Sequence, residues 1–267
     1  MPANFKLNGN KKIYFASDLH LGAYELEESH GRERKFCDWL NKISVDAQAI
    51  YIVGDLFDFW FEYETVVPKG FIRVLGKLAE MSGQGIKIYF LPGNHDLWAK
   101  DYLVHEVGFE IIHGSAIHSW NGHNFYISHG DGLGPGDTSY KFLKRIFLFK
   151  PFNWVFRILH PDLGVKLASW LSRGSRLRSG DKDLRTLPKE KEPLYQFAIH
   201  ESGKIDIDTW IFGHRHLPMS EKLPNGKNFI NLGDWIYHFT WASFSEKTGI
   251  VLRSENEKIQ KKLGENW

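Results

Sequence analysis

Seven polar side chains that could bind metal ions stand directly after short apolar runs, at the points where buried strands would end: Asp18, His20, Asp55, Asn94, His129, His214 and His216. Carboxylate, imidazole and amide-oxygen ligands without a thiolate favour ions such as Mn, Fe or Zn, and they disfavour a structural zinc site. The carboxyl ends of strands in an open α/β sheet share one edge, so residues far apart in sequence can converge there. The seven residues therefore predict one site for a pair of divalent cations.

Two neighbouring cations repel each other, so such a site needs an anionic ligand between them. Asp55 stands centrally in the order of the motifs, and we predict that its carboxylate bridges the pair. Taken singly, an Asp or His at a strand end is more often a helix cap or a surface residue than a ligand. A glycine precedes three of the seven residues and permits tight turns that would aim the next side chain inward: Gly54, Gly93 and Gly213.

The apolar runs before these residues have the composition of buried strands. Most are four to six residues long, are rich in Ile, Val, Phe and Tyr, and end at Gly, Pro or Asp. The predicted strands are Lys12–Ser17, Ala49–Val53, Ile86–Leu91, Asn124–Ser128, Thr209–Phe212 and Asn228–Asn231. Helical patterns at Arg32–Ile43 and Gly70–Met81 separate the first three. Strand–helix–strand alternation predicts parallel β-α-β units in an α/β fold.

Residues 134–195 interrupt this alternation, and we predict that they form a helical lid inserted into a core of residues 1–133 and 196–267. Between 141 and 185 stand eleven Lys or Arg against three Asp, a net charge of +8 in a chain whose net charge is +2. Aromatic residues accompany these basic ones. A solvated helical face without a function can have such a composition. However, a lid that is both apolar and positive suits an amphiphile with a phosphorylated head, or an anionic membrane surface.

The composition of 42% hydrophobic and 25% charged residues is typical of a soluble globular protein. Cys37 is the one cysteine, which excludes an internal disulfide framework and a Cys-rich zinc site, and favours a reducing compartment. No N-terminal apolar stretch resembles a signal peptide, and no run of about 18 apolar residues could span a bilayer. We therefore expect a cytoplasmic protein.

Five short motifs resemble, in order and spacing, the signature of calcineurin-like metallophosphoesterases: DLH at 18–20, GDLFD at 54–58, GNHD at 93–96, SHGD at 128–131 and GHRH at 213–216. The resemblance implies a four-layer α/β/β/α sandwich and two divalent cations, Mn²⁺ first, with Fe or Zn as alternatives. It implies one cation bound by Asp18, His20, Asp55 and His216. The second would be bound by Asp55, Asn94, His129 and His214.

The same resemblance implies a hydrolytic mechanism. A hydroxide that bridges the cations would attack phosphorus in line, while the cations stabilise the developing charge. His95 would act near the leaving group as general acid or phosphate contact, and Asp96 would orient the His95 ring. Asn94 would contribute through the second cation. Asp58 is expected to support the ligands or the fold without binding a cation, and the eight histidines outside the motifs are expected to be structural.

Within the superfamily, GDLFDFW at 54–60 and HGDGLGPGDTSY at 129–140 resemble the branch of UDP-2,3-diacylglucosamine pyrophosphohydrolases. These enzymes cut their substrate to lipid X (2,3-diacylglucosamine 1-phosphate) and UMP in lipid A biosynthesis. SRGSR at 172–176 resembles the lid motif of that branch. The resemblance implies six substrate contacts: Asp137, Tyr140, Arg173, Ser175, Arg176 and Lys182.

The chain departs from that branch at His95, where Arg is usual. The alternative is therefore another calcineurin-like phosphodiesterase or nucleotide pyrophosphatase with a different amphiphilic or nucleotide substrate. A third class is non-enzymatic: a metal-bearing scaffold, or a nucleic-acid binder that uses the basic segment. The complete ligand set argues against a scaffold. We expect a nucleotide-lipid substrate at an anionic membrane surface, no nucleic acid and no obligate protein partner.

Overall fold

The computed structural model describes residues 2–135, 141, 144–147, 149–167, 170 and 188–265. Its strands are β1 (Ala3–Phe5), β2 (Lys12–Ala16), β3 (Ala47–Ile52), β4 (Lys87–Phe90), β5 (Phe109–Ile111), β6 (Ser115–Trp120), β7 (His123–Ser128), β8 (Thr209–Phe212), β9 (Pro218–Lys222), β10 (Asn228–Leu232), β11 (Thr240–Ser245) and β12 (Gly249–Ser254). Its helices are α1 (Leu26–Ile43), α2 (Ile72–Gly83), α4 (Lys150–Ile158), α6 (Pro193–Ser202) and α7 (Glu257–Glu265), with short turns at η1 (Leu103–Val107) and η2 (Lys189–Lys191).

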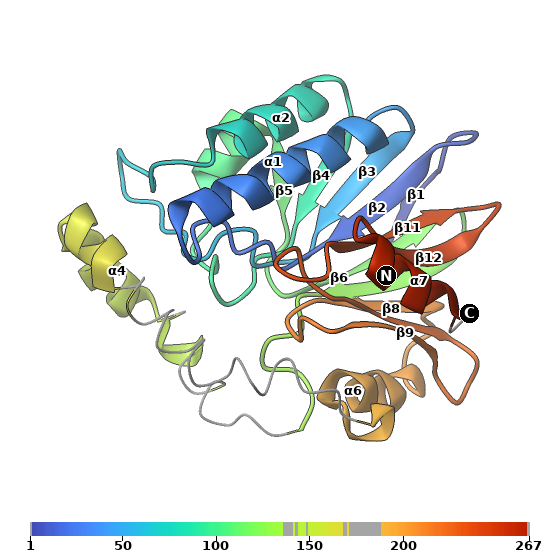
Figure 1. Cartoon of the computed structure of the whole chain (residues 1–267). Coiled ribbons are helices and arrows are strands. Elements are labelled where there is room, and N and C mark those ends of the chain that lie inside the picture. The colour runs from blue at the N-terminus through green and yellow to red at the C-terminus, as the bar shows by residue number, and fades with distance from the viewer. Residues whose placement is uncertain are drawn as a thin grey trace.

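The described strands form two six-stranded sheets. One has the order β12-β11-β2-β3-β4-β5, in which β2 to β5 pair in parallel and β11 pairs antiparallel with both neighbours. The other has the order β1-β6-β7-β8-β10-β9 and mixes parallel with antiparallel pairs. Figure 1 shows α1 and α2 on the outer face of the first sheet and α6 against the second. The predicted α/β/β/α sandwich is confirmed.

Alternation along the strands sends side chains into different layers of the core. In β2, Ile13 and Phe15 join the cluster between the two sheets, where they pack with residues of the second sheet such as Phe125 and Ile211. Tyr14, the residue between them, faces the cluster beneath α1 and α2. Strands buried on both faces are apolar throughout, which is why β2, β3 and β4 are recognisable from sequence.

The six predicted strands all form, and the Asn121–Gly122 pair makes a hairpin turn between β6 and β7. Both turn residues have positive φ, 50° and 83°, as a tight hairpin requires. α1 starts at Leu26, before the predicted Arg32, and the polar end of the chain after Ser254 continues into the helix α7. Among the described residues, no helix is both long and apolar enough to cross a bilayer.

The described part of the predicted insertion is helical at α4 and at residues 161–167. It packs on the loops after β3 and β4 through aromatic contacts: the Trp98 ring stacks on Phe156 at 5.3 Å between centroids, and its Nε1 donates to the Phe147 carbonyl at 3.0 Å. α6 begins at Pro193, inside the predicted range 134–195, and its buried Leu194 packs on the second sheet. The first turn of α6 therefore packs with the core.

Candidate metal centre

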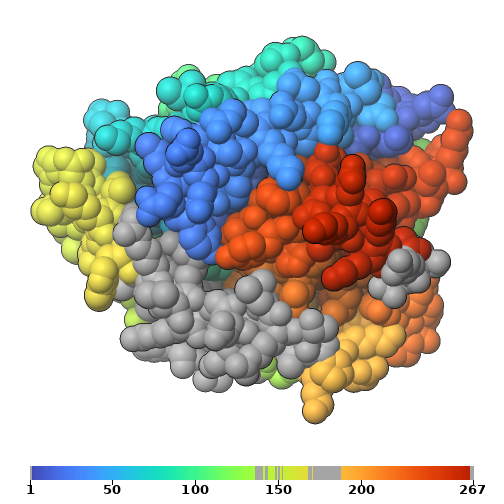
Figure 2. Space-filling view, viewed as in Figure 1, coloured from blue at the N-terminus to red at the C-terminus, as the bar shows by residue number. Residues whose placement is uncertain are grey.

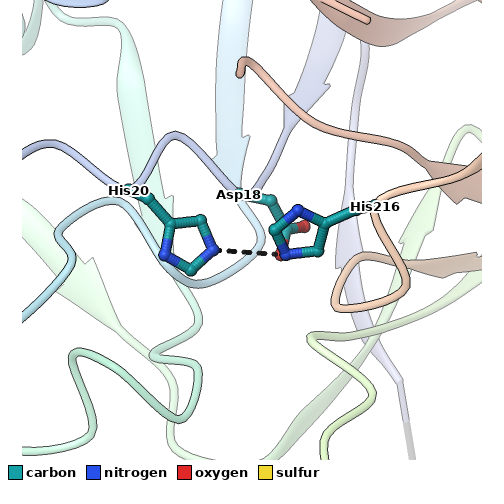
Figure 3. A group of neighbouring side chains, drawn as sticks. All are labelled: Asp18, His20 and His216. Atoms are coloured by element: carbon teal, nitrogen blue, oxygen red, sulfur yellow. Dashed lines mark ion pairs between the residues drawn. The ribbon is translucent and has the colours of Figure 1, made fainter. Parts of the chain in front are cut away.

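The fold brings all seven predicted ligand residues to one edge of the sheets. Three groups of side chains place possible ligand atoms within 4.8 Å of one another: Asp18, His20 and His216; Asp55, His129 and His214; and His20, Asp55 and His95. Figure 3 shows the side chains of the first group pointing toward one another. Asn94 joins the second group, because its Oδ1 lies 3.2 Å from His129 Nε2. In the chain these residues follow the ends of β2, β3, β4, β7 and β8.

The backbone at these positions is itself unusual. Five of the seven residues adopt left-handed backbone conformations, with φ between 45° and 68°: Asp18, His20, Asp55, His214 and His216. Non-glycine residues rarely have positive φ, and each such conformation costs about 1–3 kcal/mol that the surrounding structure must offset. Left-handed residues at the ends of three strands are therefore held there by the fold, and they turn the side chains toward a common point.

Distances between the ligand atoms fit a bound cation. His129 Nε2 lies 3.2 Å from Asp55 Oδ2, and His216 Nε2 lies 3.4 Å from Asp18 Oδ1. Ligands about 2.1 Å from one ion are separated from each other by roughly 3.0–3.4 Å in octahedral or tetrahedral geometry. His20 Nε2 is slightly farther, 3.9 Å from Asp18 Oδ1. The described residues thus supply a hard donor set at coordination spacing.

Asp55 lies between the two groups. Its Oδ2 is 3.2 Å from His129 Nε2 and 3.6 Å from His20 Nε2, so one oxygen faces a histidine of each group. Its Oδ1 accepts a hydrogen bond from the His95 amide at 2.9 Å, which fixes the carboxylate plane. This is the position that a bridging ligand needs.

The tautomer of His129 follows from its neighbours. Nδ1 lies 2.9 Å from the Val53 carbonyl oxygen, which can only accept a hydrogen bond, so Nδ1 carries the proton. Nε2 faces Asp55 and Asn94, and loss of its proton would direct a lone pair to the point where a cation would bind. A carbonyl acceptor behind the ring is the usual way in which proteins orient a metal-binding histidine.

Glycines let the loops after β3 and β4 approach each other closely. The predicted tight turn explains one of these glycines, and lack of space explains the other. Gly54 does have a positive φ of 80°, as a tight turn requires. Gly93 instead provides space, because a Cβ there would collide with the Asp55 carboxylate and would lie 2.7 Å from His129 Nε2. Any larger residue at 93 would displace two of the candidate ligands.

The prediction that Asp96 orients the His95 ring is wrong. The buried Asp96 carboxylate accepts backbone amides of both motif loops, with the Leu56 and Gly93 amides at 2.7 Å. The His95 ring is held by Asp58 instead: Nδ1 donates to the Asp58 carbonyl at 2.8 Å and lies 3.7 Å from the Asp58 carboxylate. The Asp58 carboxylate also lies 3.5 Å from His20 Nδ1.

Sequence reasoning missed Asp234. It is fully buried and accepts the amides of Ile236, Tyr237 and His238 at 2.7–2.9 Å, while its Oδ2 lies 2.9 Å from His238 Nδ1 and 3.9 Å from His216 Nδ1. The carboxylate therefore orders the turn of residues 236–238 and lies behind the ring of a candidate ligand. A signal was available, because Asp234 follows Gly233 at the end of an apolar strand, like Asp55 after Gly54.

Electrostatics at the site favour positive charge. Burial, reinforced by the nearby Asp55, raises the pKa of Asp18 to about 8. Burial opposes protonation of His129, yet the Asp55 and Asp18 carboxylates raise its pKa well above the usual value. Burial and neighbouring histidines lower the pKa of His214 to about 4 and that of His216 to about 3. The last two rings are therefore neutral at pH 7, the form that binds a metal.

These pKa values predict that cation affinity rises with pH. Asp18 and His129 hold protons at neutral pH because their pKa values are raised, and a cation must displace those protons. Apparent affinity for Mn²⁺ should therefore fall by up to about tenfold per pH unit, per displaced proton, as the pH drops from 8 to 6. Titration of free Mn²⁺ at several pH values measures this, and an affinity that stays constant across this range would contradict it.

The six predicted substrate contacts in the insertion lie outside the described residues: Asp137, Tyr140, Arg173, Ser175, Arg176 and Lys182. Two described ion pairs nevertheless connect the ends of the insertion to the ligand loops. Lys144 Nζ lies 2.6 Å from Asp131 Oδ2, beside His129, and Arg215 Nε lies 2.9 Å from Glu192 Oε1. The insertion is thus anchored next to the second group of ligands.

A family model and several curated proteins are similar to this chain over most of its length. The family model described as calcineurin-like phosphoesterase matches residues 11–218. A UDP-2,3-diacylglucosamine hydrolase of Porphyromonas gingivalis is 40% identical over 257 residues, covering 91% of this chain and 97% of the relative. Proteins of the same name are 29% identical in Pasteurella multocida, covering 84% and 90% of the two chains, and 27% identical in Shewanella baltica, covering 91% and 97%.

Proposed function

Because the chain belongs to the calcineurin-like phosphoesterase family, we propose that it hydrolyses UDP-2,3-diacylglucosamine to lipid X and UMP, a step of lipid A biosynthesis. Membership makes it a metallophosphoesterase with buried His and Asp clusters suited to a dinuclear site. The substrate is inferred from the names of its relatives, which align over nearly their whole length. The observation that carries the hydrolytic part is Asp55 Oδ2, which lies between histidines of two ligand groups.

We assign the cation ligands by these groups. Asp18, His20, Asp55 and His216 would hold one cation, and Asp55, Asn94, His129 and His214 the other, with Mn²⁺ as the proposed metal. Two bound divalent cations supply a water of lowered pKa as nucleophile and stabilise negative charge on the phosphoryl oxygens. The chain's own contribution is to fix the ligands, through left-handed backbone and the buried carboxylates of Asp96 and Asp234.

His95 is the proposed proton donor to the leaving oxygen, or its phosphate contact. Its Nδ1 donates to the Asp58 carbonyl at 2.8 Å, and we assign the contact with the substrate to Nε2. The side chain is only 13% exposed, and the His20 ring lies beside it at 4.6 Å between centroids. Such a confined ring can hold a proton at a defined position near the reacting phosphoryl group.

The test compares two substrates with purified, Mn²⁺-loaded protein. UDP-2,3-diacylglucosamine should release UMP, whereas UDP-N-acetylglucosamine, which lacks the two acyl chains of that substrate, should react at least about a hundredfold more slowly. Reaction in ¹⁸O-labelled water should place the label in a product phosphate, since a P–O bond is broken. EDTA should abolish turnover and Mn²⁺ should restore it. Equal rates on both substrates would favour the alternative, a nucleotide pyrophosphatase without a lipid requirement.

The proposal includes work at an anionic membrane surface, on the cytoplasmic side of the inner membrane. The described insertion exposes large apolar side chains, each at least 56% accessible: Trp154, Val155, Ile158, Leu163 and Trp170. Basic residues stand among them in the sequence, including Arg157 and Lys166. Helices that expose apolar and cationic groups together bind at the interface of anionic bilayers.

We expect the double substitution Trp154→Ser with Ile158→Ser to weaken binding to phosphatidylglycerol vesicles by about tenfold or more. The reason is that it removes two large apolar side chains that would enter the lipid. Co-sedimentation measures the bound fraction. Val45→Ser is the matched control, because Val45 is 76% exposed on the core at the end of α1. Unchanged sedimentation of the double variant would remove this part of the proposal.

A further inference from the structure

A hollow of about 530 Å³ lies beside the candidate metal centre and has no role so far. Its walls come from α1 and the loop before it and from residues 236–239, and they include Tyr24, Arg32, Lys35 and Tyr237. Figure 2 shows α1, in blue, and the C-terminal segment, in orange to red, side by side on this face. The volume is within the range of about 300–1,000 Å³ that is usual for small-molecule sites.

One wall continues the loop that carries Asp18 and His20, and the other follows β10 and is held by Asp234, near His216. The Arg32 guanidinium donates through Nη2 to the carbonyls of His20 at 3.1 Å and Ala23 at 2.8 Å. The opposite wall is fixed by Asp234, which accepts the Tyr237 amide at 2.7 Å and lies 3.9 Å from His216. The hollow therefore adjoins the backbone of residues 20–23 and the turn held by Asp234, which flank the first ligand group.

The hollow is positively charged. Arg32 is only 7% exposed, and in the described part of the chain neither it nor Lys35 forms an ion pair with a carboxylate. Lys35 Nζ instead lies 3.5 Å from the centroid of the Phe239 ring. Glu28 also lines the hollow, so its three charged side chains leave one net positive charge. A buried cation without an anionic partner is costly unless a ligand offsets it.

The hollow also presents aromatic rings. Tyr24 and Tyr237 are 44% and 49% exposed, and their hydroxyl oxygens lie 3.2 Å apart. Exposed rings side by side at a concave site suit a planar heterocycle, which stacks on them with little dependence on its identity. Aromatic rings with adjacent cations match the two parts of a nucleotide, its base and its phosphate.

We propose that this hollow binds the nucleoside monophosphate half of the substrate, with the base against Tyr24 and Tyr237 and the phosphate toward Arg32 and Lys35. The proposal rests on the proposed function and adds to it the orientation of the substrate across the metal centre. The insertion is anchored beside the second ligand group, through Lys144 with Asp131 and Arg215 with Glu192. The nucleotide would therefore extend from the first ligand group, and the lipid half from the second.

The test is direct binding of UMP, uridine and inorganic phosphate to the full-length, Mn²⁺-loaded protein by calorimetry. Wild-type protein should bind UMP more tightly than phosphate. Tyr237→Ala should weaken UMP binding by about tenfold, as loss of a base-stacking ring does, and leave the affinity for inorganic phosphate unchanged. Tyr237→Phe keeps the ring and should retain most of the affinity. Lys35→Gln should weaken UMP binding several-fold, and less so at high salt.

Lys42→Gln is the matched control on the same helix, since Lys42 lies two turns later and pairs with Glu255 at 2.6 Å. Wild-type affinity for UMP in both Tyr237→Ala and Lys35→Gln would overturn the assignment of the hollow. This readout is separate from turnover of UDP-2,3-diacylglucosamine. If the hollow variants lose UMP while the wild type does not cleave that lipid, the proposed substrate is wrong and the nucleotide site stands.

Discussion

Asp55→Asn should remove both cations and lower kcat/KM by at least about a thousandfold. The reason is geometric: Oδ2 of this carboxylate lies 3.2 Å from His129 Nε2 and 3.6 Å from His20 Nε2, so a neutral amide there weakens both positions at once. Metal content by elemental analysis should fall from two ions per chain toward none. Substitution of a residue belonging to only one group, such as His216, should spare the other ion.

The fold should survive Asp55→Asn, because the amide keeps an oxygen that can accept the His95 amide now bound at 2.9 Å. Burial opposes the charge of Asp55, and His129 and His95 hold its pKa well below the usual value, so the native carboxylate is ionised. Unfolding temperatures in EDTA should therefore stay close to wild type. Asp38→Asn, at an exposed position on α1, is the matched control. Two retained ions with normal turnover would exclude Asp55 as the bridge.

The fold and the seven ligand candidates could be predicted because burial of the central strands produces two patterns in the sequence, the apolar runs and the polar residues that follow them. Strands such as β2, β3 and β8 are buried on both faces, so they are uninterrupted apolar runs, and the polar residue that ends each run is conspicuous. The strands that were missed are short or lie toward the sheet edges. β9, with the sequence PMSEK, is only partly buried and has no apolar pattern to detect.

The roles of supporting residues could not be read in the same way. Asp96 adjoins His95 in sequence, yet its carboxylate points back to the amides of Leu56 and Gly93, because the turn separates the two side chains. The hollow beside the site depends on Tyr24 and Tyr237, whose hydroxyls meet across 213 positions of the chain. Such contacts depend on the packing of the two sheets and leave no local pattern.

Asp96→Ala should be the most destabilising single change at the site, although Asp96 is not among the candidate ligands. Its fully buried carboxylate accepts the Gly93 and Leu56 amides at 2.7 Å, and the amides of Asp55 and Phe57 at 3.3 and 3.4 Å. Alanine would leave these donors without acceptors in a dry interior, at a cost of about 3 kcal/mol or more. In a domain of this size that lowers the Tm by on the order of 10 °C.

Asp96→Ala also distinguishes a structural role of Asp96 from a role in orienting the His95 ring. If Asp96 joins the GDLFD and GNHD loops, Asp96→Ala should lose metal affinity together with stability, since Asp55 and Asn94 are both on those loops. Asp96→Asn should be only partly better, because an amide offers one acceptor oxygen and turns a donor toward backbone N–H groups. A role through the His95 ring instead predicts wild-type Tm and metal content with a shifted pH–rate profile. Calorimetry and elemental analysis of the two variants decide between these outcomes.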